Sequence, residues 1–182
     1  MKRWGLLCAG ILLFAGIASA QEAPKVEVFG GYSYLYTSIG GGFRGTNFDL
    51  GGSGSIAFNF NNWFGVVGDV GGYHTGNLVG GHNSGNVITF MGGPKFAYRA
   101  DKATLFAQTL FGGARFASNA VAPNFSTTSF AMALGGGVDV NVSEHFAVRP
   151  AQVEYILTRF NLGFNPMSQN SVRYSAGVVF KF

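Results

Sequence analysis

The sequence predicts an all-β fold: a closed, antiparallel, up-and-down transmembrane β-barrel of eight strands that follows a cleaved signal peptide. Three observations support this prediction. After residue 25, apolar residues alternate with small or polar ones at a period of two, which is typical of strands with unlike faces. The connections between the expected strands alternate strictly in length. Only 11% of the residues are charged, whereas an ordinary soluble domain has about 25%.

The beginning of the chain has the three features of a secretory signal peptide. Lys2 and Arg3 precede a short apolar run over residues 4–17, and Ala18-Ser-Ala20 supplies a small-residue cleavage pattern. This run is shorter than the roughly 20 apolar residues that a spanning helix needs. We therefore expect a signal peptide over residues 1–20 and one barrel domain over residues 21–182.

Charge and cysteine content exclude several classes of function. The only cysteine, Cys8, lies in the signal peptide, so the mature chain has no disulfide and no cysteine metal site. The net charge of +4 falls to 4 − 2 = +2 once Lys2 and Arg3 are removed. Because the remaining Lys and Arg residues are not clustered, we expect no nucleic-acid partner.

Each expected strand has a large apolar face and a face of small residues, mostly Gly, Ser, Ala and Thr, with isolated charges. Val179 is the one apolar residue of the last segment on the polar face. In chain order, the apolar faces are Val26, Val28, Tyr32, Tyr34 and Tyr36; Phe48, Leu50, Ile56, Phe58 and Phe60; Phe64, Val66 and Val70; Ile88, Phe90, Phe96 and Tyr98; Phe130, Met132, Leu134, Val138 and Val140; and Val172, Tyr174, Ala176, Val178, Phe180 and Phe182.

Two segments are less regular. Residues 105–116 carry apolar side chains in both phases, so the orientation of Gln108 and Arg115 stays open. Residues 145–160 change phase near Pro150, where we expect a β-bulge, because proline has no N–H to donate to a strand ladder.

The connections predict how the chain runs back and forth. Short turns are expected at 61–62, 100–102 and 141–144, and longer Gly-, Ser- and Asn-rich loops at 38–46, 76–85, 117–128 and 161–170. Eight strands joined in this way place both termini and the short turns on the periplasmic side and the long loops outside.

Alternation alone does not decide which face meets solvent, and a soluble lipocalin-like barrel would bury the apolar face. Small residues suit the interior of an eight-stranded barrel, which is only just wide enough for side chains. The same residues would make a poor soluble exterior. Aromatic residues also concentrate towards strand ends, as in the aromatic belts of membrane barrels. We therefore expect the apolar face to point to lipid.

The segment from Tyr174 to Phe182 resembles the carboxy-terminal strand of bacterial outer-membrane barrels, with alternating hydrophobics that end in phenylalanine. With the leader and the loop alternation, the chain resembles the small bacterial outer-membrane β-barrel family that includes OmpX and the membrane domain of OmpA. The resemblance implies a location in the bacterial outer membrane among membrane lipids, including lipopolysaccharide. It also implies that Tyr174, Phe180 and Phe182 form a signal for the barrel-assembly machinery. It does not extend to cell-wall anchoring, because no peptidoglycan-binding domain follows the barrel.

The charges on the small-residue face are expected inside the barrel. Since buried charges must be paired, they should form an internal network of ion pairs and water that plugs the lumen. Spacing does not determine which acid meets which base. The expected interior charges are Glu27, Asp49, Asp69, Lys95, Asp139, Arg149, Glu154, Arg173 and Lys181.

For function, the sequence favours a non-enzymatic surface barrel that acts in interaction, adhesion or envelope integrity. Its candidate contact residues lie in the expected long loops: Phe43, Arg44, Phe125, Phe164 and Met167. A narrow pore for ions or small solutes is the first alternative, although eight strands argue against a wide channel.

A lipid-modifying enzyme is the second alternative, with His74, His82 and Ser84 at or in one outer loop. No G-x-S-x-G or H-E-x-x-H motif accompanies these residues. The match of Gly40–Gly45 to G-x-G-x-x-G is not followed by a helix that could bind phosphate. We expect no catalytic residues, no metal and no cofactor.

Overall fold

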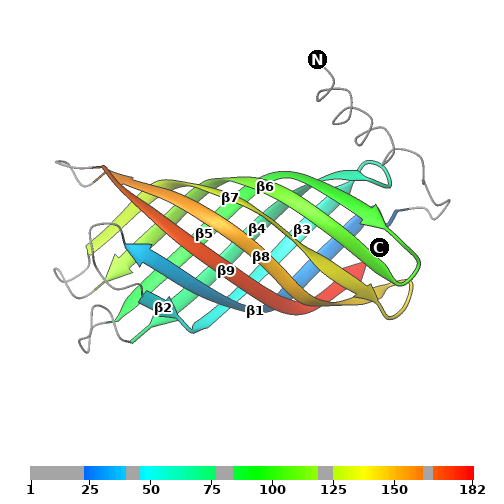
Figure 1. Ribbon diagram of the computed structural model, residues 1–182, viewed down its shortest axis with the longest axis horizontal. Coiled ribbons are helices and arrows are strands. Elements are labelled where there is room, and N and C mark those ends of the chain that lie inside the picture. Colours follow the sequence, from blue (N-terminus) through cyan, green and yellow to red (C-terminus); the bar gives the residue numbers. More distant parts are fainter. Residues whose placement is uncertain (1–22, 40–45, 77–83, 119–124, 162–165) are drawn as a thin grey trace, which may run out of the picture.

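The computed structural model describes residues 23–39, 46–76, 84–118, 125–161 and 166–182. The described strands form one closed antiparallel barrel (Figure 1), in which β1 pairs with both β2 and β3, each strand from β3 onward pairs with the next, and β9 pairs back with β1. The strands are β1 (Val26–Ile39), β2 (Thr46–Phe48), β3 (Leu50–Asn59), β4 (Phe64–Thr75), β5 (Gly85–Arg99), β6 (Ala103–Ser118), β7 (Phe125–Asn141), β8 (Phe146–Asn161) and β9 (Pro166–Lys181).

Elements β2 and β3 together act as one barrel strand, since both pair with β1 and only Asp49 separates them. The expected closed barrel of eight antiparallel strands is therefore confirmed. No helix in the described parts of the chain has the length and apolar character needed to cross a membrane.

The predicted outward direction of the apolar face is also observed. Large apolar side chains such as Phe58, Val70 and Leu134 are exposed on the outer surface, whereas mainly small and polar residues, with some apolar ones, line the interior. Aromatic rings gather where β3, β4 and β5 meet a short turn, and Trp63 stacks on Phe96 with ring centroids 6.1 Å apart. This surface suits hydrocarbon flanked by an aromatic interface.

The two ends of the barrel differ. The start of β1, the end of β9 and the short turns β3–β4, β5–β6 and β7–β8 lie at one end, here named the inner end (Figure 1). The opposite end is named the outer end. Strands β5 to β9 contain 15–17 residues, more than the roughly 9–11 that span a bilayer.

The strands reach further into two expected loops than the sequence predicted. The backbones of Phe125 and Met167 belong to β7 and β9 rather than to loops. Cross-strand pairing continues there because each extra residue pair satisfies backbone N–H and C=O groups.

The expected bulge near Pro150 is confirmed. Arg149 pairs with Gly177 and Gln152 with Ser175, so Pro150 and Ala151 together face only one residue of β9. The extra residue shifts the alternation of β8 by one position, so that the polar side chains beyond the proline again point into the barrel.

A second bulge, which the sequence did not predict, separates β2 from β3. Leu35 pairs with Phe48 and Tyr32 with Gly52, so two residues of β1 face three residues that begin with Asp49. The phase shifts by one residue. Phe48 consequently points inward and is buried, although the sequence placed it on the outer face.

Candidate functional site: the charged interior of the barrel

The structure buries eight of the nine charged residues that were expected in the interior. Asp49 differs: it is exposed, because the bulge between β2 and β3 turns it to the other face. Its interior assignment is corrected accordingly. The eight buried residues are Glu27, Asp69, Lys95, Asp139, Arg149, Glu154, Arg173 and Lys181.

Arg173 on β9 joins three strands in the middle of the lumen. Its Nε donates to Glu154 Oε2 at 2.6 Å, and its Nη1 donates to Asp69 Oδ1 at 2.7 Å. The same Nη1 lies 3.2 Å from the Tyr73 hydroxyl. Gln108 Nε2 donates to the other oxygen of Glu154 at 2.8 Å, so the open orientation of Gln108 is resolved as inward.

Arg149 forms a second group nearer the inner end. Its Nε and Nη2 bind the two carboxylate oxygens of Asp139 at 2.6 and 2.9 Å, a bidentate geometry. The guanidinium also lies between the rings of Phe29 and Phe106, 4.4 and 4.2 Å from their centroids. The β8 bulge produces this pair, because it sets both Arg149 and Pro150 opposite Asp139.

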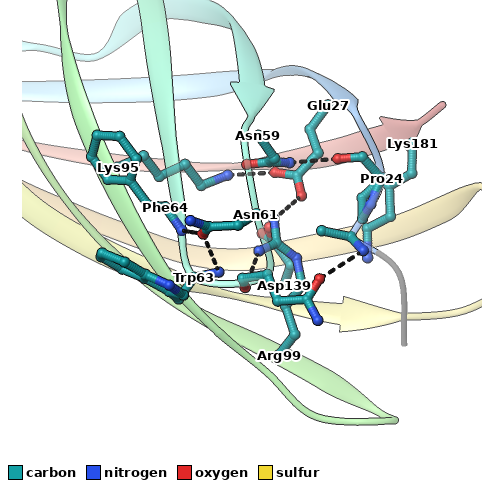
Figure 2. Close-up of polar contacts among 12 residues, drawn as sticks. Pro24, Glu27, Asn59, Asn61, Trp63, Phe64, Lys95, Arg99, Asp139 and Lys181 are labelled. Carbon is teal, nitrogen blue, oxygen red and sulfur yellow. Dashed lines mark hydrogen bonds and ion pairs between the residues drawn. The ribbon is translucent and has the colours of Figure 1, made fainter. Parts of the chain in front are cut away.

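A third group lies at the inner end and is drawn in Figure 2. Glu27 accepts one hydrogen bond on each oxygen, from Lys95 at 2.5 Å and from Arg99 at 2.8 Å. Arg99 also donates to the backbone carbonyl of Asn62 at 2.6 Å. Lys181 donates to Asn141 Oδ1 at 2.5 Å.

Arg99 and Tyr73 were not among the expected interior site residues. Arg99 lies four positions after Lys95 and therefore shares its face, so the alternation could have identified it. Tyr73 shares the face of Asp69 in the same way, but an aromatic residue in this sequence is more typical of the lipid side.

Apolar side chains complete the filling of the lumen. Leu35, Phe48, Leu110 and Ile156 belong to one buried cluster in the middle and outer parts of the strands, and Leu110 and Arg173 are both 0% exposed. Ion pairs between strands far apart in sequence, such as Asp69 with Arg173, connect opposite parts of the wall. The interior is thus packed with side chains, and most of its charges form ion pairs.

Two of the three histidines lie at opposite ends of the barrel. His74 points outward and its Nδ1 lies 2.7 Å from Asn86 Oδ1, while His145 is exposed in an inner turn. His82 lies outside the described residues. Among the described residues, no group of three or more His, Cys, Asp or Glu side chains could hold a metal ion.

The expected contact residues at the outer end are only partly described. Phe43, Arg44 and Phe164 lie outside the described residues, and for Phe125 and Met167 only the backbone is described. The open orientation of Arg115 is resolved as outward: its side chain is exposed and its Nη2 lies 3.4 Å from Ser126 Oγ.

The proposed assembly signal lies on the outer surface of β9. The side chains of Tyr174, Phe180 and Phe182 are all exposed there. Phe180 also makes an edge-to-face contact with Phe146, with centroids 5.6 Å apart.

A closed barrel with a lipid-compatible exterior and mostly paired charges inside defines a small transmembrane β-barrel. The sequence matches the family described as outer membrane protein beta-barrel domain over residues 6–182, and the chain belongs to this family. The protein is therefore located in the bacterial outer membrane, where short turns face the periplasm and the outer end faces the cell exterior. Its surroundings are membrane lipids. No curated protein matches the sequence.

Solved structures show the same fold. Neisserial surface protein A has a TM-score of 0.69 and 13% sequence identity over 89% of this chain and 100% of its own. Ail, the attachment invasion locus protein of Yersinia pestis, has a TM-score of 0.55 and 16% identity over 88% and 99%. OprG from Pseudomonas aeruginosa has a TM-score of 0.56 and 13% identity over 89% and 97%.

Proposed function

We propose that the protein is a non-enzymatic surface barrel whose outer end contacts ligands, other cells or host molecules, or supports the integrity of the envelope. The observation that carries this proposal is the filled lumen: ion pairs around Arg149 and Arg173, together with buried apolar residues such as Leu110, occupy the interior. Because the lumen is filled, we expect the outer end of the barrel, and not a channel through it, to carry the function.

Two proteins of similar structure support a role at the cell surface. Ail carries the description of an attachment invasion locus protein, and the neisserial relative that of a surface protein. We assign a comparable surface role to Phe43, Arg44 and Phe164, together with Phe125 and Met167 at the outer ends of β7 and β9. Further proposed partners are lipopolysaccharide, near which the exposed Arg115 would lie, and the barrel-assembly machinery during biogenesis.

Cell-adhesion measurements test this role. Cells that carry the wild-type protein should bind host cells or matrix proteins more strongly than cells without it, and the double variant Phe43→Ala/Arg44→Ala should lose at least half of this gain. The control Asp101→Ala/Lys102→Ala changes an inner-end turn and should bind like the wild type. If all four strains bind equally and resist detergent equally, both the adhesion role and the envelope role are wrong.

A narrow pore remains the second candidate, because the lumen carries many polar groups. Planar-bilayer recordings distinguish the two functions. The surface-barrel proposal expects no steady current from the wild type. A steady current that changes when Arg149 or Asp69 is replaced would favour the pore.

A further inference from the structure

The inward-facing charges are unevenly distributed along the barrel. In the inner part, the cations Lys95, Arg99, Arg149 and Lys181 accompany the anions Glu27 and Asp139, an excess of 4 − 2 = +2 among described side chains. In the middle, Arg173 accompanies Asp69 and Glu154, which gives 1 − 2 = −1. The positive excess therefore lies next to the periplasmic opening.

The two carboxylates of the inner part are already fully engaged. Both oxygens of Asp139 bind Arg149, and Glu27 gives one oxygen to Lys95 and the other to Arg99. Among the described residues, Lys181 consequently has no ion-pair partner. Its one recorded hydrogen bond is to the neutral side-chain oxygen of Asn141, although its residue is only 7% exposed.

Lys181 and Arg99 lie close to the same acid. Lys181 is the cross-strand register partner of Glu27, and Arg99 donates to that carboxylate (Figure 2). The inner-end turns hold both cations in place: Arg99 binds the carbonyl of Asn62, and Asn141 is anchored to the carbonyl of Asp101 at 3.2 Å. The site is thus built before any ligand arrives.

Both cations lie near the periplasmic opening, and Arg99 remains partly exposed. The Arg99 side chain keeps 12% of its surface exposed, and both residues lie at the inner ends of their strands, β5 and β9. The surrounding wall of protein and lipid has a low dielectric constant, which concentrates the field of the two excess charges in the opening.

We propose that the inner mouth of the barrel, formed by Lys181 and Arg99 beside Glu27, binds a small phosphate-type oxyanion. An ammonium group supplies a point charge with free donors, and a guanidinium supplies planar donors that match phosphate oxygens. A multivalent oxyanion would neutralise the excess that the two inward-facing carboxylates, Glu27 and Asp139, leave in the inner part. The same chemistry is offered by free inorganic phosphate and by the phosphate headgroup of a lipid in the inner leaflet.

Titration of the whole refolded protein with inorganic phosphate tests the proposal. The protein is kept in an uncharged maltoside detergent at constant ionic strength, and binding is followed by calorimetry and by broadening of the phosphorus NMR signal. The wild type should bind, and Lys181→Gln should bind at least tenfold more weakly. Arg99→Gln provides a second variant in case Lys181→Gln fails to fold, as judged by heat-modifiable migration.

Two matched controls locate the site. Lys102→Gln removes an exposed lysine of an inner-end turn, and Arg115→Gln removes an exposed outward arginine, so both should bind phosphate like the wild type. Competition with short-chain phosphatidylglycerol identifies the source: displacement at lower concentration than inorganic phosphate points to a lipid headgroup, and the reverse order points to a free anion.

Three results would overturn the proposal. The first is a wild type that does not bind phosphate. The second is equal binding by folded Lys181→Gln and Arg99→Gln, which would mean that phosphate binds elsewhere. Glu22 immediately precedes the described residues of the inner end. The third result is binding that appears only in Glu22→Gln, because the chain's own carboxylate would then occupy the mouth. None of these results bears on adhesion, so the surface role of the outer end is tested separately.

Discussion

The Tyr174 hydroxyl donates a 2.7 Å hydrogen bond to the backbone carbonyl of Pro150. Pro150 lies in the β8 bulge, where the regular ladder to β9 is interrupted. The Tyr32 hydroxyl binds the carbonyl of Asp49 in the β2–β3 bulge in the same way. Each bulge frees a carbonyl group, and in a membrane an unpaired carbonyl is costly because no water replaces the lost partner. A tyrosine on the neighbouring strand supplies that partner in both cases.

Tyr174→Phe should therefore lower the free energy of unfolding by about 1–3 kcal/mol, the cost of leaving an acceptor unsatisfied where no water replaces the lost partner. Urea unfolding of the protein in phosphatidylcholine vesicles measures the effect. Tyr155→Phe is the matched control, because Tyr155 also points outward and its hydroxyl has no recorded hydrogen bond to the described residues. Equal losses in the two variants would contradict a specific role of the hydroxyl of Tyr174.

Removing one partner of the Arg149–Asp139 pair should be strongly destabilising. Arg149→Met should cost about 3–5 kcal/mol, because it leaves the buried Asp139 carboxylate without its counter-charge. The double variant Arg149→Met/Asp139→Asn should recover part of this loss, and the same urea titration reports it. Arg115→Met, which removes an exposed arginine, should change stability by no more than about 0.5 kcal/mol. Strictly additive effects of the two interior substitutions would rule out the coupling.

The orientation of the apolar face predicts the effect of a charge on the lipid side. Val178 points outward from β9 and pairs with Gly30 and Val148. Val178→Arg should cost about 2–4 kcal/mol if the side chain lies at the bilayer midplane, and less towards an interface. Val142→Arg serves as the control in an exposed inner-end turn, with an expected change near zero. A fully stable Val178→Arg protein that needs no detergent would show that this face does not meet lipid.

Gly93 and Gly68 form a matched pair that tests how closely neighbouring strands pack. A Cβ atom on Gly93 would lie 2.0 Å from the backbone oxygen of Thr109, whereas one on Gly68 would meet nothing within 4 Å. Because a strand backbone shifts less readily than a side chain, Gly93→Ala should destabilise the barrel by about 1–3 kcal/mol. Gly68→Ala should keep the wild-type stability. Heat-modifiable migration and urea unfolding together show whether this order holds.

Local periodicity was enough to predict the strands, their faces and the alternation of turns and loops. Residues such as Phe58 and Phe180 could be assigned to the outer face because every second side chain of a strand points the same way. The phase change at Pro150 could also be predicted from the sequence, since proline has a local effect on strand pairing. The phase change at Asp49 was not, because the residues around it carry no comparable signal.

The sequence by itself determined the class of the protein: eight amphipathic strands whose large apolar faces point to lipid and whose small faces fit inside a narrow closed barrel. The tertiary structure alone decided how Arg173 meets Asp69, how Lys95 and Arg99 share Glu27, and that Gln108 points inward while Arg115 points outward. The physical reason is that alternation along a strand depends only on neighbouring residues. Partners across the lumen, by contrast, depend on register and bulges, which arise when the whole sheet closes.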